Sequence, residues 1–137
     1  MADPAAPLTD GDYAALADFR HALREFQAFS ERRAADQGLT PQQHQALLAI
    51  RAAASGAPTV GEVARRLMLK PHSATGLVNR LADQGWIDRI AATDDRRRAR
   101  LRLTPRAHAA LAALSAAHRD EIRRMRPTLE AMLEAIG

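Results

Sequence analysis

Large apolar residues recur at helical spacing near the start of the chain. From Asp12 to about Asp36 they lie three or four positions apart, and the set is Tyr13, Leu16, Phe19, Leu23 and Phe26. A helix turns by about 100° per residue, so this spacing places them on one face. Gly38 then favours a helix end. The pattern predicts a helix over about 12–36 with one apolar stripe.

Two capping boxes mark the starts of the next helices. A Thr followed three residues later by Gln or Glu occurs at Thr40–Gln43 and at Thr59–Glu62. Such pairs satisfy the first free amides of a helix, and Pro41 suits the first helical position. We therefore expect one helix from position 41 that Gly56 terminates, and a short one that ends near Leu67.

A fourth helix is predicted from Pro71 to about Gln84, after a turn at 68–70 and before a stop at Gly85. At 100° per residue, its side chains fall into two separate sides of the helix. One side is apolar and holds Ala74, Leu77, Val78 and Leu81, whereas the other holds His72, Ser73, Gly76, Asn79, Arg80 and Asp83, with Thr75 at the edge. Small polar groups, an amide and a guanidinium can reach base edges in a major groove, and a glycine permits close approach. An ordinary amphipathic surface helix would split in the same way, although it would usually carry more Glu and Lys.

A β-hairpin follows. Residues 87–90 favour a short strand, and residues 91–96 a turn that contains Asp94 and Asp95. Ala99, Leu101 and Leu103 then alternate with Arg98, Arg100 and Arg102, which predicts a strand with one buried face and one arginine face. Six arginines occur between positions 96 and 106. An arginine at a hairpin tip can enter a minor groove, and the two aspartates can orient it. A solvated charged surface is the plainer alternative.

The last third predicts a long helix that begins at Thr104–Pro105. Its apolar side carries Leu111, Leu114, Ile122 and Met125. We expect Pro127 to kink or break it, after which Leu129, Met132, Leu133 and Ile136 continue the apolar face. This seam and the stripe over 12–36 exceed what a small core can cover, so a homodimer is expected.

Composition narrows the class of protein. The 137 residues suit one domain, and the chain is 47% hydrophobic but only 4% aromatic, which favours alanine-rich helices. It contains no cysteine, so disulfides, thiolate metal sites and a thiol redox switch are excluded. The N-terminus lacks the features of a signal peptide, and no stretch is apolar enough to cross a membrane. We therefore expect a cytoplasmic protein with no membrane contact.

Positive charge is concentrated in the middle of the chain. Residues 57–106 hold 11 Lys and Arg against 5 Asp and Glu, whereas the whole chain has a net charge of +4. This distribution suits a centre that binds a polyanion, or else a solvated basic surface.

Together these elements predict a mainly α fold with a small β-hairpin wing. We expect a winged helix-turn-helix with N- and C-terminal dimerisation helices in a single domain over 1–137. The dimerisation helices would span about 12–36 and 105–137, and the DNA-binding region about 40–104.

Two segments resemble the MarR family of winged-helix transcription regulators. The stretch DRRRARLRLT, residues 95–104, is similar to the family's wing, in which D-x-R precedes a strand that ends in Leu-Thr. The segment MLKPHSATGLVNRLADQGWIDR resembles its recognition helix and first wing strand. The similar layout extends from about Tyr13 to Ile136. Ala92 and Arg100 depart from the pattern, where many members have an aspartate and an apolar residue, respectively.

The resemblance implies a homodimeric regulator, with repression as the expected action, that reads a palindrome in double-stranded DNA. Arg97 would be the wing-tip arginine in the minor groove, Asp95 would orient it, and Ser73 and Thr75 would meet bases and phosphates. The expected DNA-binding set is His72, Ser73, Thr75, Gly76, Asn79, Arg80, Asp95, Arg96, Arg97 and Arg98. Many members release DNA when a small lipophilic or aromatic effector binds. His21, His44 and Trp86 are candidates to line such a pocket, although core packing or surface exposure is the plainer reading of each.

Other classes of function are less well supported. There is no phosphate loop, catalytic arrangement or cofactor motif, so no enzyme is expected. No metal is expected either, because His108 and His118 are ten residues apart and not at the spacing of helical ligand pairs. Two rivals remain: a winged-helix protein whose arginines bind an acidic protein, and a helical dimer that binds small molecules and has lost DNA function. The salt dependence of binding to random duplex DNA separates the first from a DNA-binding protein, and the intact Asp95 and Arg97 argue against the second.

Overall fold

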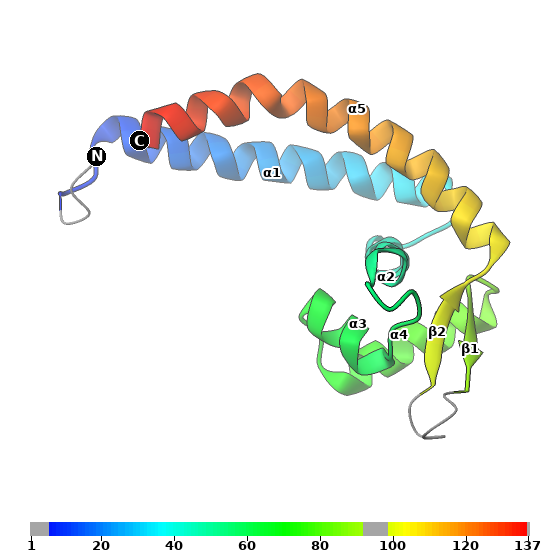
Figure 1. Ribbon diagram of the computed structural model, residues 1–137. Coiled ribbons are helices and arrows are strands. Elements are labelled where there is room, and N and C mark those ends of the chain that lie inside the picture. The colour runs from blue at the N-terminus through cyan, green and yellow to red at the C-terminus, as the bar shows by residue number, and fades with distance from the viewer. Residues whose placement is uncertain (1–5, 92–98, 137) are drawn as a thin grey trace. The chain divides into compact units, whose positions relative to one another are not determined.

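The computed structural model describes residues 6–91 and 99–136. Within them are α1 (Asp10–Asp36), α2 (Pro41–Ala52), α3 (Val60–Leu67), α4 (Pro71–Asp83), β1 (Ile87–Ile90), β2 (Arg100–Leu103) and α5 (Pro105–Ile136) (Figure 1). This mainly helical fold with one antiparallel hairpin confirms the predicted winged architecture. The predicted wing-tip residues Asp95, Arg96, Arg97 and Arg98 lie outside the described residues.

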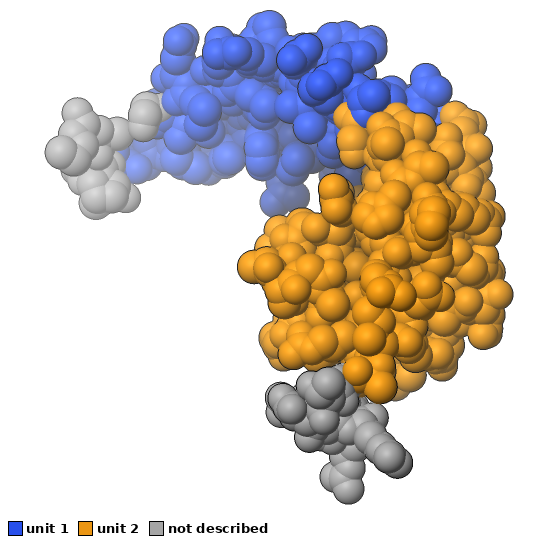
Figure 2. Space-filling model, turned by 45° about the vertical axis from the view of Figure 1, so that its right-hand side comes forward, with its two compact units in different colours: residues 1–33, 116–137 blue, residues 34–115 orange. Residues whose placement is uncertain are grey.

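The chain divides into two compact units (Figure 2). Residues 34–115 form a winged unit, and residues 1–33 with 116–137 form a helical unit. The division of the single predicted domain into dimerisation and DNA-binding parts stays a prediction.

Both predicted capping boxes are formed in the winged unit. The Thr40 hydroxyl accepts a hydrogen bond from the Gln43 amide at 3.2 Å, and the Gln43 side chain accepts one from the Thr40 amide at 3.1 Å. Thr59 and Glu62 make the same exchange at 3.2 and 3.0 Å. These bonds satisfy orphan amides at two helix starts and so fix where α2 and α3 begin.

The expected end of α2 is wrong. The helix ends at Ala52, because Ala53 already has an extended backbone, and Gly56 lies in the turn beyond it with φ of +74°. Glycine favours positions with positive φ, and such positions occur in turns as well as at helix caps. Gly85 does cap α4: with φ of +79° it lets the Trp86 amide donate to the Leu81 carbonyl at 2.9 Å.

The hairpin is antiparallel, with Ile87 opposite Leu103 and Arg89 opposite Leu101. Leu101 and Leu103 are buried, as the alternation predicts, and the strand begins at Arg100. The predicted arginine face is only partly correct. Arg102 is exposed, but Arg100 is half-buried and donates to the Ala57 carbonyl at 3.0 Å. The segment before α3 runs beside β2 there, so this arginine satisfies a backbone carbonyl of the protein itself.

One core joins the elements of the winged unit. Its largest fully buried side chains come from every helix and strand of the unit except α5, and they include Leu47, Ile50, Val63, Leu77, Leu81, Ile87 and Leu101. Each such side chain contributes roughly 1.5–3 kcal/mol on burial. This core holds α4 against α2, α3 and β1 and so fixes which face of α4 is exposed.

In the helical unit, α1 lies alongside residues 116–136 of α5 in antiparallel fashion (Figure 1). Helix α1 begins at Asp10 and not at Asp12, because Thr9 and Asp12 exchange side chain–backbone hydrogen bonds at 2.9 and 3.2 Å. Helix α5 continues through Pro127, so it does not break there, and the kink that was the other expected outcome stays a prediction. None of the described helices is long and apolar enough to cross a membrane.

The predicted stripe of α1 is not its buried face. Small residues, Ala15 and Ala22, are buried there, and Phe26 is half-buried. The large side chains stay exposed: Tyr13 by 60%, Leu16 by 41%, Phe19 by 40% and Leu23 by 41%. Periodicity located an apolar stripe, but close packing between two helices favours the small side chains at its border.

Candidate nucleic-acid interface

Helix α4 presents the polar face that the sequence predicts. Ala74, Leu77, Val78 and Leu81 are at most 2% exposed and pack into the core. The opposite side chains are exposed, and they are His72, Ser73, Thr75, Asn79 and Arg80. The core therefore pins one side of α4 and leaves a continuous polar surface free to meet a ligand.

Gly76 lies in the middle of that face and is half-buried. A Cβ added there would meet Arg80 Nη1 at 3.6 Å, which is ordinary contact. Its own surroundings thus do not require glycine, and the missing side chain leaves the backbone of α4 open to close approach.

The hydroxyl of Thr75 is already used within the helix. Its Oγ1 donates to the carbonyl of Pro71 at 3.0 Å. In this geometry Thr75 offers an acceptor and not a donor to a partner. Its side chain, expected at the edge of the polar face, is exposed.

Arg89 was not among the predicted site residues, although it contacts the exposed face of α4. From β1 its guanidinium donates a hydrogen bond to Asn79 Oδ1 on α4. The period-two pattern contains the signal, because Arg89 lies two residues after the buried Ile87 and so shares its face of the strand. The pair ties the first wing strand to the exposed face of α4.

Arg106 binds to other residues of the protein. Its guanidinium lies 3.8 Å from the centroid of the Trp86 ring and donates to the Gln84 carbonyl at 2.7 Å. Thr104 Oγ1 donates to the Gly85 carbonyl at 2.8 Å. The start of α5 is thereby fastened to the end of α4. Two of the six predicted basic residues between 96 and 106, Arg100 and Arg106, thus have partners within the protein.

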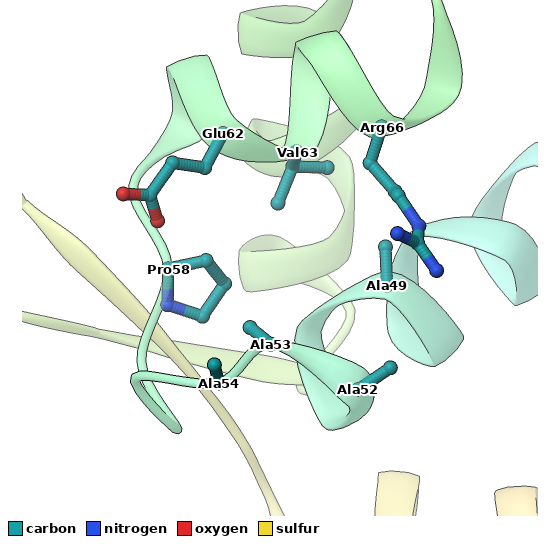
Figure 3. Close-up of a pocket in the computed structure, with 8 residues that line it drawn as sticks. All are labelled: Ala49, Ala52, Ala53, Ala54, Pro58, Glu62, Val63 and Arg66. Atoms are coloured by element: carbon teal, nitrogen blue, oxygen red, sulfur yellow. The ribbon is translucent and has the colours of Figure 1, made fainter.

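A hollow lies between the end of α2 and α3 (Figure 3). Alanines of α2 and the following turn form its wall with Pro58 and Val63, and Glu62 and Arg66 extend from α3 on either side of Val63. One oxygen of the Glu62 carboxylate accepts from the Thr59 amide. Glu62 and Arg66 are the charged groups that line this hollow.

The three residues considered for an effector pocket belong to both units. Trp86 and His44 are buried in the winged unit, at 2% and 4% exposure. His21 lines a second hollow, in the helical unit, and pairs with Glu25 at 2.6 Å. No cluster of His, Asp or Glu that could hold a metal occurs in the described ranges, and His118 instead contacts Ser30 Oγ at 2.8 Å.

Comparison with known proteins points to one family. Residues 37–98, which run from just after α1 to the segment between the strands, match the model of the MarR family. This winged-helix region is similar to the MarR family. Among curated proteins, no sequence gives a significant match.

Several solved structures share the fold. A crystal structure of a MarR-family transcription regulator is 25% identical, covers 87% of this chain and 76% of its own, and has a TM-score of 0.70. YusO from Bacillus subtilis is 27% identical over 88% of this chain and 85% of its own, with a TM-score of 0.66. A mutant of S. aureus MepR bound to an oligodeoxyribonucleotide is 20% identical over 96% of this chain and 100% of its own, with a TM-score of 0.71. The similarity to transcription regulators supports the expectation that the chain is not an enzyme.

Proposed function

We propose that the protein is a homodimeric transcription repressor that reads a palindromic DNA operator with α4 in the major groove and an arginine wing in the minor groove. One observation carries the proposal: α4 is pinned by its apolar side and exposes a face of small polar groups, a glycine, an amide and a guanidinium. Helices of this kind dock base edges through one face. The similar MepR structure was solved with an oligodeoxyribonucleotide, which supports the same partner here.

Each residue predicted on the polar face of α4 has a proposed role in DNA binding. His72 and Ser73 lie in the first turn, where the helix dipole and free amides favour a phosphate. Gly76 admits the backbone close to the DNA, and Thr75 offers an acceptor beside it. Asn79 and Arg80, one turn further on, are placed to reach bases.

The wing is the second part of the proposal. Arg97, with Arg96 and Arg98 beside it, would enter the minor groove, and Asp95 would orient the Arg97 guanidinium. The support is the family's D-x-R pattern and the formed hairpin, whose strands β1 and β2 flank residues 91–99 in the chain. A minor groove concentrates negative potential and therefore attracts such arginines.

Exposed apolar side chains support the homodimer. Ten large hydrophobics are exposed among the described residues, and eight belong to the helical unit: Leu8, Tyr13, Leu16, Phe19, Leu23, Ile122, Leu133 and Ile136. Leu133 is 72% exposed and Tyr13 60%. Monomers rarely leave so much apolar surface in water, so we infer that a second copy of this unit covers it.

Release of DNA by a small lipophilic or aromatic effector completes the proposal. The hollow at α2–α3 has a mainly apolar wall of alanines, Pro58 and Val63, which supports this part of the proposal, whereas the hollow in the helical unit is lined mainly by charged and polar side chains. An effector must favour the DNA-free state, so its binding and DNA binding must weaken each other by the same factor.

Selection from random duplexes tests the proposal. The purified protein should enrich an inverted repeat, and its affinity for random duplex should fall linearly with salt on a log–log scale. Failure to bind any duplex at low salt, together with binding to acidic proteins, would establish the rival in which the basic surface serves a protein contact.

A further inference from the structure

The hydrogen bond between Arg89 and Asn79 determines what α4 can offer to a base. We propose that the two side chains act as one reading unit that presents mainly hydrogen-bond donors, and that this unit selects guanine in the major groove. This inference rests on the proposed DNA-binding function and deepens it by naming the base.

The register of the hairpin explains how Arg89 reaches α4. Arg89 pairs with Leu101 and Ile87 pairs with Leu103, so all four side chains share one face of the hairpin. Ile87, Leu101 and Leu103 are buried there, whereas Arg89 is exposed at the end of the same row. Its stem can follow the apolar surface while its charged head emerges beside α4, where it meets Asn79 Oδ1.

The chemistry of guanidinium fixes the orientation of the amide. An arginine has five donor hydrogens and no acceptor, so the Asn79 atom that faces it must be the oxygen. Turning the amide over would place its NH₂ group against a cation that also only donates. The charged partner also strengthens the bond relative to a neutral one. Asn79 is therefore held with its Nδ2 directed away from Arg89.

This orientation changes the base that Asn79 suits. An unrestrained asparagine pairs with adenine through both its oxygen and its nitrogen. Arg89 takes one of the two lone pairs of Oδ1 and places a cation beside this oxygen, so donors predominate among the groups left to face DNA: the Nδ2 hydrogens and the remaining guanidinium hydrogens. Guanine presents two acceptors, O6 and N7, on its major-groove edge. The pair thus matches guanine and opposes adenine, whose N6 also donates.

The test compares selections from random duplexes for the native protein and for Arg89→Met, which keeps the stem and removes every donor. We expect the native protein to enrich guanine at one symmetric pair of positions, by roughly tenfold or more. Arg89→Met should lose that preference or turn it toward adenine, while the rest of the motif persists. Arg102→Met is the matched control, because it removes an equal charge from the opposite face of the hairpin and should leave every base preference unchanged.

Two further measurements sharpen the result. Replacing the selected guanine by 7-deazaguanine, which lacks the N7 acceptor, should weaken the native protein and leave Arg89→Met little affected. Asn79→Asp, at an exposed position, should weaken the guanine preference, because a carboxylate only accepts and the Nδ2 donor is lost, while the Arg89 donors remain. An unchanged motif in both Arg89→Met and Asn79→Asp would overturn the inference, as would an equal loss of affinity on all sequences. A native protein that enriches no sequence would instead overturn the proposed function.

Discussion

Arg80 stands on the exposed face of α4, with its guanidinium near Gly76. Arg80→Ala should weaken binding to the selected operator by about 1–3 kcal/mol more than binding to random duplex, because a base contact carries sequence information and a phosphate contact does not. Titrations on both DNAs measure the difference. Arg51→Ala, at an exposed position of α2, is the control. Equal losses on the two DNAs would mean that Arg80 touches only phosphate.

Arg97 belongs to the proposed wing tip. Arg97→Ala should weaken binding on every sequence and reduce the log–log salt slope by about 1, because one phosphate neutralisation is lost with its released counterions. It should also remove a preference for narrow, A·T-rich flanks. Affinity is measured over a range of salt concentrations. A slope identical to that of the native protein would show that Arg97 makes no such contact.

For Asp95, the predicted change in DNA affinity is opposite to the one that simple electrostatics predicts. If it orients Arg97, Asp95→Ala should bind DNA less well, in a milder form of the Arg97→Ala defect, although it removes negative charge near phosphates. Equilibrium titration of both variants, with circular dichroism to verify the fold, makes the comparison. Tighter binding by Asp95→Ala would assign Asp95 no orienting role.

The exposure of single residues was predictable in α4, where the helical periodicity decides which side chains enter the core. The apolar and polar sides of α4 follow from 100° steps, because the core takes the whole of one side. The partners of polar side chains were not predictable. The bond of Arg89 to Asn79 and the stacking of Arg106 on Trp86 depend on register and on contacts between distant segments, which local patterns do not encode.

At the scale of elements, helix caps carry a prediction about stability. Thr59→Ala removes the hydroxyl that accepts from the Glu62 amide at 3.2 Å. It should lower the free energy of unfolding by about 1 kcal/mol. Denaturant titration at fixed protein concentration measures this loss. The control is Thr128→Ala, at an exposed position within α5, which should not destabilise the protein, because alanine is the better helix former. Equal stability of Thr59→Ala and the native protein would contradict the role of the cap.

Helix starts were easier to predict than helix ends. Capping boxes join residues only three apart, so Thr40–Gln43 and Thr59–Glu62 act locally. Gly56 and Pro127 gave wrong or incomplete expectations, because a glycine serves turns as well as caps and because tertiary packing can carry a helix through a proline. The stripe of α1 was found, but which border of it packs on α5 depends on the small residues Ala15 and Ala22.

At the scale of the whole molecule, the exposed apolar residues of the helical unit predict a stable dimer. Light scattering at micromolar concentration should give twice the chain mass of 14.9 kDa. Phe19→Glu, on that surface, should shift the protein toward monomer, because a charge would be buried without a partner. Leu48→Glu, at a similarly exposed apolar position of α2, should leave the dimer intact. A native protein that is only monomeric would refute the dimer.

The central claim, that a homodimer reads two half-sites with α4, is tested most directly by footprinting the protein on its selected operator. The account predicts two protected half-sites in inverted orientation, with major-groove contacts about one helical turn, roughly 34–36 Å, apart or a multiple of it. Protection of a single asymmetric half-site would contradict it.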